Sequence, residues 1–127
     1  MTCKEITGII VDTAIQVHRA LGPGLLESVY QAVLGYELAA RGLKVEHEVG
    51  FPVVWKEVRL DVGFRADLVV EGRVIVELKA CEAVLPVHKK QLLSYLRLAD
   101  KRVGLLINFN ELRLVDGITR LVNGVED

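Results

Sequence analysis

The apolar positions in the first forty residues follow the spacing of two helices. Between residues 4 and 21, apolar side chains recur every three or four positions, which places them on one face of a helix. Residues 22–24, Gly-Pro-Gly, end this pattern. A second helical pattern covers residues 26–41, and Gly42 follows it as a residue that readily takes the left-handed conformation at a helix end.

Strand-like patterns follow the second helix. Residues 44–62 divide into two strands around a turn at residues 56–57, and Pro52, which has no N–H group, indicates an edge or a bulge. Residues 64–80 read FRADLVVEGRVIVELKA and predict two buried strands joined at residues 71–72.

The last third of the chain predicts one more helix and further strands. Pro86 suits the first turn of a helix that runs to about residue 100. Residues 102–109, RVGLLINF, are typical of a buried strand. Residues 112–122 predict a terminal hairpin that turns at Asp116 and Gly117.

This order of elements predicts an α/β fold in which a central mixed β-sheet is flanked by α-helices. One domain over residues 1–127 accounts for the length. Hydrophobic residues make up 51% and charged residues 26%, a globular balance that argues against disorder. No apolar run reaches the roughly 20 residues that cross a bilayer, and no signal-peptide pattern opens the chain. We therefore expect a cytoplasmic protein that does not enter a membrane.

Asp67, Glu77 and Lys79 are the charged residues within the apolar strands of residues 64–80 that are candidates for chemistry. Asp67 and Glu77 could hold a hard cation such as Mg²⁺, because this ion prefers carboxylate and water oxygens and an unpaired buried carboxylate is costly. Lys79 follows Glu77 by two positions, so both side chains lie on the same face of a strand. A lysine beside such a site can stabilise negative charge or orient water, which favours phosphodiester hydrolysis.

The register of this hairpin decides whether Asp67 and Glu77 meet. A two-residue turn at residues 71–72 would place Asp67 opposite Val76 and send Glu77 to the other face. Because one residue of slip reverses every side chain, a shared metal site requires an odd loop, a β-bulge or a strand bend near Asp67. We expect such an irregularity. The other interpretation is an exposed or edge carboxylate at Asp67 and a same-face ion pair between Glu77 and Lys79.

Three motifs along the chain resemble those of one nuclease architecture. The first is the G-x-x-E-x-x-Y pattern that names the GxxExxY proteins. The others are the strand carboxylate with its E-x-K element and the later Q-x-x-x-Y helix element of the PD-(D/E)XK superfamily. The resemblance extends from about residue 6 to residue 109. The matching residues are Gly24, Glu27, Tyr30, Asp67, Glu77, Leu78, Lys79, Gln91 and Tyr95.

The resemblance implies a restriction-endonuclease-like core with one Mg²⁺-dependent site, at which Mn²⁺ could substitute. Asp67, Glu77 and Glu27 would hold the metal or its water, together with the backbone carbonyl of Leu78. Lys79 would stabilise charge and help to activate water. These roles come from the family and not from the spacing of the residues.

The two helices that carry the remaining motif residues also have simpler interpretations. Glu27 lies in a first helical turn, where the helix dipole favours a carboxylate, and Tyr30 and Gln31 lie one turn on, where they could orient it. By resemblance Gln91 would position substrate, and Tyr30 and Tyr95 would support the site. Gln91 and Tyr95 could instead simply pack against the sheet.

The charge balance gives limited support to nucleic-acid binding. Sixteen basic and seventeen acidic residues leave a net charge of −1, whereas affinity for DNA rests on Lys and Arg contacts to phosphates. Some of the basic residues recur at helical intervals near Gln91, so one helix face could approach a phosphate backbone. A solvated helix face is the other interpretation. The cluster consists of Lys89, Lys90, Arg97, Lys101 and Arg102.

The cysteines and histidines do not predict a metal site of their own. Cys3 and Cys81 are isolated and lack the spacing of zinc ligands. His18, His47 and His88 are scattered. His18 lies among the apolar positions of the first helix, so we expect an interior or interface histidine there.

Together these features predict a metal-dependent nuclease that hydrolyses phosphodiester bonds in nucleic acid, with DNA favoured. The alternative is a catalytically silent, nuclease-like module that binds nucleic acid or protein. So small a domain leaves little room for a sequence-reading module, so a partner protein could supply specificity, and a homodimer is a further option.

Overall fold

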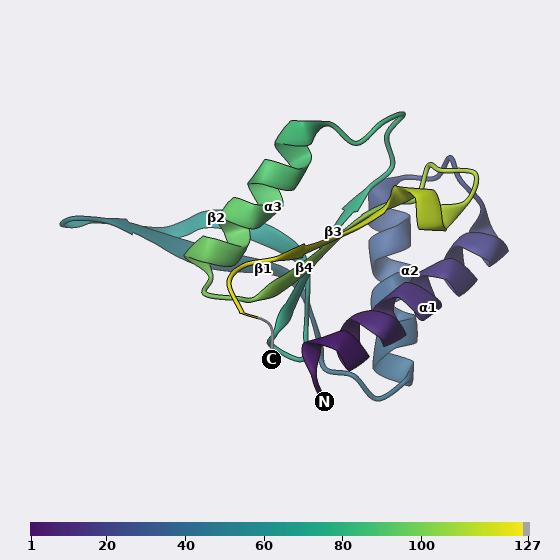
Figure 1. The fold of residues 1–127 in the computed structure, drawn as a ribbon, viewed down its shortest axis with the longest axis horizontal. Helices are drawn as coiled ribbons and strands as arrows, with labels where there is room; N and C mark the ends of the chain where they lie inside the picture. The colour runs from purple at the N-terminus through teal and green to yellow at the C-terminus, as the bar shows by residue number, and fades with distance from the viewer. Residues whose placement is uncertain (126–127) are drawn as a thin grey trace.

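The computed structural model describes residues 1–125 as a sheet with helices on both faces (Figure 1). In this part of the chain the sheet has five strands in the order β1-β2-β3-β4-β5, and it is mixed. α1 and α2 cover one face and α3 covers the other. The predicted α/β fold is confirmed. The elements are α1 (Cys3–Leu21), α2 (Glu27–Ala40), β1 (Val45–Trp55), β2 (Val58–Val70), β3 (Val74–Lys79), α3 (Pro86–Leu98), β4 (Val103–Asn108), η1 (Leu114–Gly117) and β5 (Ile118–Val122).

Local capping explains where α1 begins and ends. The Thr2 hydroxyl accepts a hydrogen bond from the Glu5 N–H (3.1 Å), and the Glu5 carboxylate accepts one from the Thr2 N–H (3.2 Å), which forms a capping box. Gly22 ends the helix with a φ of 73°, in the region that favours glycine. None of the helices in residues 1–125 combines the length and apolar character needed to cross a bilayer.

The β3–α3–β4 unit brings two strand ends together. β3 and β4 are parallel, with Val74 beside Val103 and Lys79 beside Asn108, and α3 connects them across one face of the sheet. The other neighbouring strands are antiparallel. The carboxyl ends of β3 and β4 therefore lie side by side, next to the loops that follow them.

The predicted hairpin over residues 112–122 is wrong. The short 3₁₀ helix η1 replaces its first strand, and β5 pairs with β4 from Ile107 opposite Ile118. The pairing satisfies backbone groups along an edge of β4, a strand whose residues are all buried. Gly117 passes close to β4, because a Cβ atom there would lie 2.6 Å from the backbone oxygen of Asn108.

β1 and β2 extend beyond the rest of the sheet as a two-stranded arm (Figure 1). β3 pairs with β2 only over Leu68–Val70. The predicted turn at residues 56–57 is confirmed, since Trp55 pairs with Val58. The irregularity expected near Pro52 is also present, as a register shift between Phe51 and Val53.

The close approach of η1 to β4 predicts that Gly117→Ala destabilises the protein. The added methyl group would meet a backbone oxygen, which cannot move as a flexible side chain can, and overpacking of this kind costs about 1–3 kcal/mol. Chemical denaturation should show the loss. The matched control is Gly8→Ala on α1, where a Cβ meets nothing within 4 Å and where alanine should stabilise the helix by about 0.5–1 kcal/mol. Equal effects of both substitutions would contradict the packing of η1.

Candidate active site

The regular alternation of side chains between the two faces of the sheet is interrupted in strand β2 at Asp67. Leu68 and Val70 are buried in the core layer beneath α1 and α2, whereas Ala66 and Val69 are buried in the layer beneath α3. In a regular strand Ala66 and Val69 would point to opposite faces. The bend near Asp67, one of the three irregularities that could allow a shared site, is therefore present.

The alternation of side chains in strand β1 is interrupted at Glu48, the residue opposite Asp67. Glu48 has a φ of 48°, which is uncommon for any residue other than glycine. His47 packs against α2, but Val49 packs in the layer beneath α3. Because the alternation is interrupted at facing positions in both strands, the pairing register of β1 with β2 is the same on both sides of the bend.

The turn between β2 and β3 adds one further residue. Glu71 and Gly72 have φ values of 55° and 63°, and the Arg73 N–H donates to the Val70 carbonyl (3.0 Å). Val70 nevertheless pairs with Val74, so Arg73 is an extra, bulged residue. The loop between β2 and β3 is therefore residues 71–73, an odd number of residues, which is one of the irregularities that place Asp67 and Glu77 opposite each other.

These two irregularities bring Asp67 and Glu77 together. The Asp67 N–H donates to Oε1 of Glu77 (3.2 Å), and the Leu78 N–H donates to Oδ2 of Asp67 (2.8 Å). Each carboxylate thus accepts a hydrogen bond from the strand that carries the other. This reciprocal arrangement fixes both side chains between β2 and β3.

Burial and like charge make Glu77 retain its proton. Removal from water is the largest effect, and the negative charge of Asp67 adds to it, so the pKa of Glu77 rises from 4.5 to about 9. The positive charge of Lys79 lowers this pKa, but it is the smallest of these effects. Asp67 and Glu77 therefore form a coupled pair that favours one added positive charge.

Lys79 lies at the end of β3, on the face that carries Glu77. Its side chain is half-buried, and Ile75, four residues earlier on the same face, is buried in the layer beneath α3. The loop after Lys79 is held by Asn108, a fully buried side chain that donates to the Cys81 carbonyl (2.9 Å) and accepts from the Cys81 N–H (3.2 Å). Asn108 is the one polar side chain in β4, which reads VGLLIN, and this contrast is the sequence signal that could have identified it.

Helix α3 places Tyr95 over the carboxylate pair. The Tyr95 ring stacks on Phe64 at a centroid distance of 4.3 Å. Burial raises the pKa of Tyr95, and the charges of Glu77 and Asp67 raise it further. Gln91 lies one turn earlier on α3 and is exposed. At a spacing of four residues it shares the helix face of Tyr95.

Helix α2 contacts the site through a residue that the sequence assigned differently. Gln31 donates from Nε2 to the backbone carbonyl of Asp67 (3.2 Å), so it supports the bend in β2 and does not orient Glu27. Tyr30 is fully buried and donates to the Gly22 carbonyl (2.6 Å), so it fixes the loop before α2. Glu27 is exposed and, by its spacing from Gln31, lies on the same helix face.

No group of three or more His, Cys, Asp or Glu side chains converges on a metal position among residues 1–125. The structure thus brings together two of the three predicted carboxylates, Asp67 and Glu77. Glu27 does not join them, and its role and that of the Leu78 carbonyl stay predictions. The observed donor set is a carboxylate pair with a lysine beside it.

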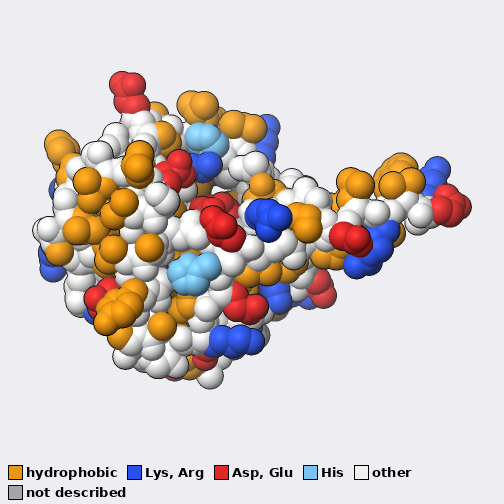
Figure 2. Space-filling view, turned by 180° about the vertical axis from the view of Figure 1, so that it is seen from behind, with side chains coloured by type: hydrophobic (Ala, Val, Ile, Leu, Met, Phe, Trp, Pro, Cys, Tyr) orange, Lys and Arg blue, Asp and Glu red, His pale blue; other side chains and the backbone are white. Residues whose placement is uncertain are grey.

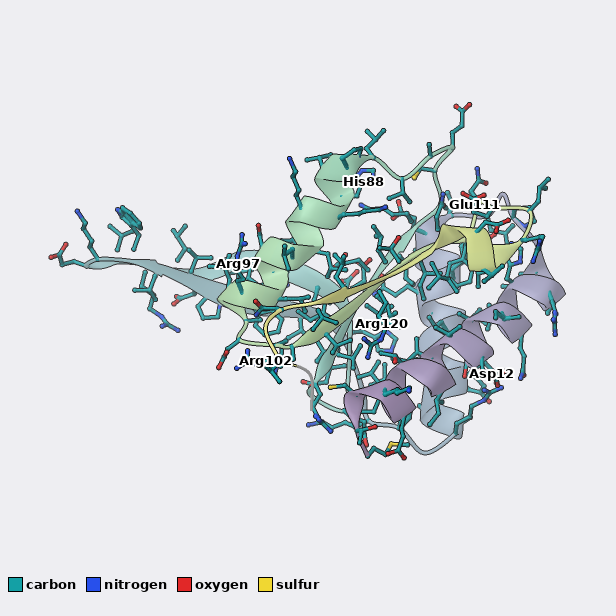
Figure 3. All side chains as sticks on the ribbon, viewed as in Figure 1. Asp12, His88, Arg97, Arg102, Glu111 and Arg120 are labelled. Atoms are coloured by element: carbon teal, nitrogen blue, oxygen red, sulfur yellow. The ribbon has the colours of Figure 1, made fainter. Side chains whose placement is uncertain are left out.

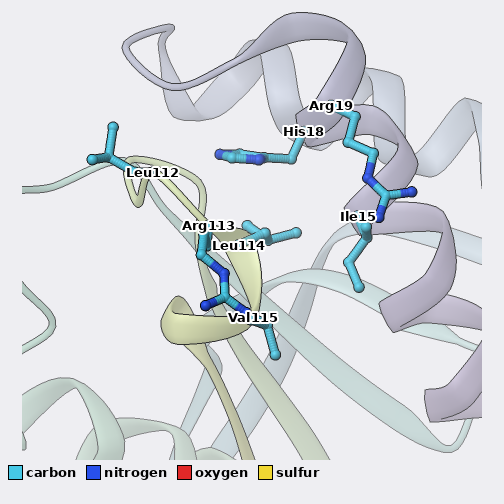
Figure 4. A pocket seen from close by; sticks show the side chains of 7 residues that line it. All are labelled: Ile15, His18, Arg19, Leu112, Arg113, Leu114 and Val115. Atoms are coloured by element: carbon cyan, nitrogen blue, oxygen red, sulfur yellow. The ribbon is translucent and has the colours of Figure 1, made fainter.

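His18 lies away from this pair, in a separate pocket of about 250 Å³ (Figure 4). The ring is buried, and Nε2 lies 2.7 Å from the carbonyl oxygen of Glu111. The expectation of an interior histidine is confirmed. Figure 4 shows the ring between α1 and the segment that leads into η1, with Arg19 and Arg113 on different walls.

The predicted basic cluster does not form one helix face. α3 ends at Leu98, and Lys101 donates from Nζ to the Gly72 carbonyl (2.6 Å). Arg102 pairs with Asp100 at 3.1 Å, beyond the end of α3 (Figure 3). Of the two interpretations that the sequence left open, a single basic helix face could therefore include only the residues before the end of α3, and Lys101 and Arg102 lie beyond it. Lys89 and Lys90 remain exposed near the start of α3.

Comparison with protein-family models agrees with this geometry. The model described as the PD-(D/E)XK nuclease superfamily matches residues 4–121. The chain belongs to the PD-(D/E)XK nuclease superfamily. Comparisons with curated proteins and with solved structures give no match.

Members of this superfamily typically depend on a metal ion, and the carboxylate pair fits that requirement. Two adjacent carboxylates, one of which retains a proton because it is buried beside a like charge, form a donor set that a divalent cation would neutralise. Mg²⁺ commonly uses one or two protein carboxylates and fills its other positions with water. Asp67 and Glu77 would hold such an ion.

The raised pKa of Glu77 predicts that the metal-free protein loses stability as the pH rises from about 4.5 to 9. In this window the folded state keeps a proton that the unfolded chain has released, so the free energy of unfolding falls by up to about 1.4 kcal/mol per pH unit. Glu77→Gln should flatten this dependence. Urea titrations in EDTA at several pH values would measure it, and an identical slope in the variant would contradict the buried pair.

Proposed function

We propose that the protein is a Mg²⁺-dependent nuclease that hydrolyses phosphodiester bonds, with DNA as the favoured substrate. The observation that carries the proposal is the hydrogen-bonded pair of Asp67 and Glu77, with Lys79 on the same strand face as Glu77. Membership of the PD-(D/E)XK superfamily supports this reaction class. The match of Gly24, Glu27 and Tyr30 to the GxxExxY pattern favours that narrower family within it.

The residues of the site have distinct roles in this proposal. Asp67 and Glu77 would hold Mg²⁺, which would supply the positive charge that polarises a phosphoryl oxygen and lowers the pKa of bound water. Lys79 holds a phosphate oxygen and stabilises the negative charge that develops during hydrolysis. Tyr95 closes one side of the site through its stack on Phe64, and this burial strengthens the electrostatic interactions of the pair.

Exposed residues around the pair suit substrate contact. Gln91, on the helix face of Tyr95, can donate to a phosphate or position water. Lys89 and Lys90 are exposed beside it and can bind the phosphate backbone electrostatically. Glu27 lies on the helix face that includes Gln31 and would hold the metal or its water.

Metal binding distinguishes this proposal from a silent nuclease-like module. We expect Mg²⁺ and Mn²⁺ to raise the unfolding temperature, because a ligand bound only by the native state stabilises it by about 2.7 kcal/mol at a hundred times its dissociation constant. Asp67→Asn should abolish this shift while the protein stays folded, since the amide oxygen can still accept from Leu78. Differential scanning calorimetry would measure both. Glu82→Gln, an exposed carboxylate outside the pair, is the matched control and should leave the shift unchanged.

Nuclease assays then separate binding from chemistry. Lys79→Met should keep the metal-induced shift and lower the cleavage rate by about 100-fold or more. Labelled single-stranded and double-stranded DNA, with RNA in parallel, would identify the substrate. Metal binding without cleavage of any of these substrates would reject the nuclease and leave the silent module. Failure of both Mg²⁺ and Mn²⁺ to bind the protein would contradict the proposed mechanism.

A further inference from the structure

The outer part of the β1–β2 arm is a ribbon of two strands with solvent on both faces. None of residues 52–63 is buried by any part of the chain that the structure describes. Figure 2 shows this arm projecting from the body, with apolar, acidic and basic side chains along it. A ribbon of two strands is only marginally stable in water by itself.

One face of the ribbon is apolar. Cross-strand pairing places Trp55 beside Val58 and Val53 beside Leu60, and alternation puts all four on one face. Trp55 is 70% exposed, and Val58 and Leu60 are each 56% exposed. Val62 continues the series at 50%. Contiguous exposed apolar side chains of this kind mark an interaction surface.

The charges of the arm argue against nucleic acid and against an anionic membrane as its partner. Lys56 and Arg59 are balanced by Glu57 and Asp61, so the tip has no net positive charge. Arg59 and Asp61 already neutralise each other at 3.1 Å on the face opposite the apolar one. Nucleic-acid surfaces are bound mainly by an excess of Lys and Arg. The partner must therefore present apolar side chains together with charges of both signs.

The sequence of the arm fits a second copy of itself. Residues 58–62 of β2 read Val-Arg-Leu-Asp-Val, which is the same apolar pattern in both directions with opposite charges on either side of Leu60. We propose that two copies pair antiparallel along β2, with the twofold axis at Leu60, and form a dimer through their arms. Val58 then faces Val62 of the other copy, and Arg59 faces Asp61 on both sides of the axis.

Other registers of this pairing are unfavourable. An axis at Arg59 would put two arginines opposite each other, and an axis at Asp61 would put two aspartates there, which is destabilising. A shift by one residue between the strands would place apolar side chains opposite charged ones, because neighbouring residues point to opposite faces. The register centred on Leu60 matches apolar with apolar side chains and positive with negative ones.

The edge of β2 that this dimer needs is open. β3 pairs with β2 only over Leu68–Val70, so among the described residues no strand occupies the outer edge of β2 along residues 58–62. Pairing there would join the two ribbons into one four-stranded sheet and would satisfy the backbone hydrogen-bonding groups along both β2 edges. The dimer leaves the carboxylate pair outside the interface, since Asp67 lies where β2 has already entered the body. The inference therefore does not depend on the proposed nuclease activity.

Charge exchange tests this pairing directly. Light scattering after size exclusion should give twice the 14.1 kDa mass of one chain for the unmodified protein. Arg59→Asp places four aspartates around the axis, and Asp61→Arg places four arginines there. Each variant should weaken the dimer about tenfold or more, because both symmetric pairs become like-charged.

Restoration of the charges makes the test specific. The double variant Arg59→Asp with Asp61→Arg should recover the dimer, and an equimolar mixture of the two single variants should form heterodimers. Arg102→Asp is the matched control, because it breaks a pair of the same spacing and length outside the arm and should leave the dimer intact. Circular dichroism would verify that each variant stays folded.

Two outcomes would overturn the proposal. One is a monomer at every concentration up to the solubility limit, including on addition of DNA. The other is a dimer whose dissociation constant is unchanged by both single reversals and by Leu60→Lys, which would place two lysines on the axis. In the second case the interface lies elsewhere on the molecule.

Discussion

The site depends on the enforced closeness of two carboxylates. Asp67 and Glu77 lie on neighbouring strands in a sheet that is otherwise apolar around them, and each accepts a hydrogen bond from the backbone of the other strand. Burial raises the pKa of Glu77 most strongly, and the negative charge of Asp67 raises it further. A geometry of this kind is unfavourable without a compensating charge, and the folded sheet maintains it because the core layers on both faces fix the strands.

The compensation for this cost is spread over the neighbouring elements. α2 fastens the bend through the hydrogen bond from Gln31 to the Asp67 carbonyl, and α3 covers it through the stack of Tyr95 on Phe64. β1 follows the bend with a positive φ at Glu48. Backbone strain of this kind persists only where the surrounding structure fixes it, and it commonly occurs at functional sites. The bend at Asp67, the raised pKa of Glu77 and the contacts from α2 and α3 therefore all belong to the same local structure around the carboxylate pair.

The sequence predicted most of the fold because periodicity and turn residues agree locally. It also identified Asp67, Glu77 and Lys79, since charges in apolar strands are conspicuous, and it showed that the pair could meet only through an irregularity. It could not indicate which irregularity, because the bulge at Arg73 and the bend at Asp67 depend on pairing between strands. Glu48 and Gln31 were missed as supports for the same reason. The partner of β5 was misassigned, because the local pattern of residues 112–122 marks a turn and a strand but does not indicate that the strand pairs with β4.

The bend at Asp67 also explains how strand β2 can pack against α3 on one side of this residue and be buried on both faces on the other. Over residues 58–63, β2 is a solvated ribbon with an apolar face and a balanced pair, Arg59 and Asp61, whereas Phe64 and Ala66 are already buried beneath α3. After the bend, residues 68–70 are almost fully buried on both faces. A regular strand would carry a single alternation from one region into the other, so that Ala66 and Val69 could not both face α3. Because the alternation is reset at Asp67, Ala66 and Val69 both face α3 while Leu68 and Val70 face α1 and α2, and Asp67 lies where the two alternations meet.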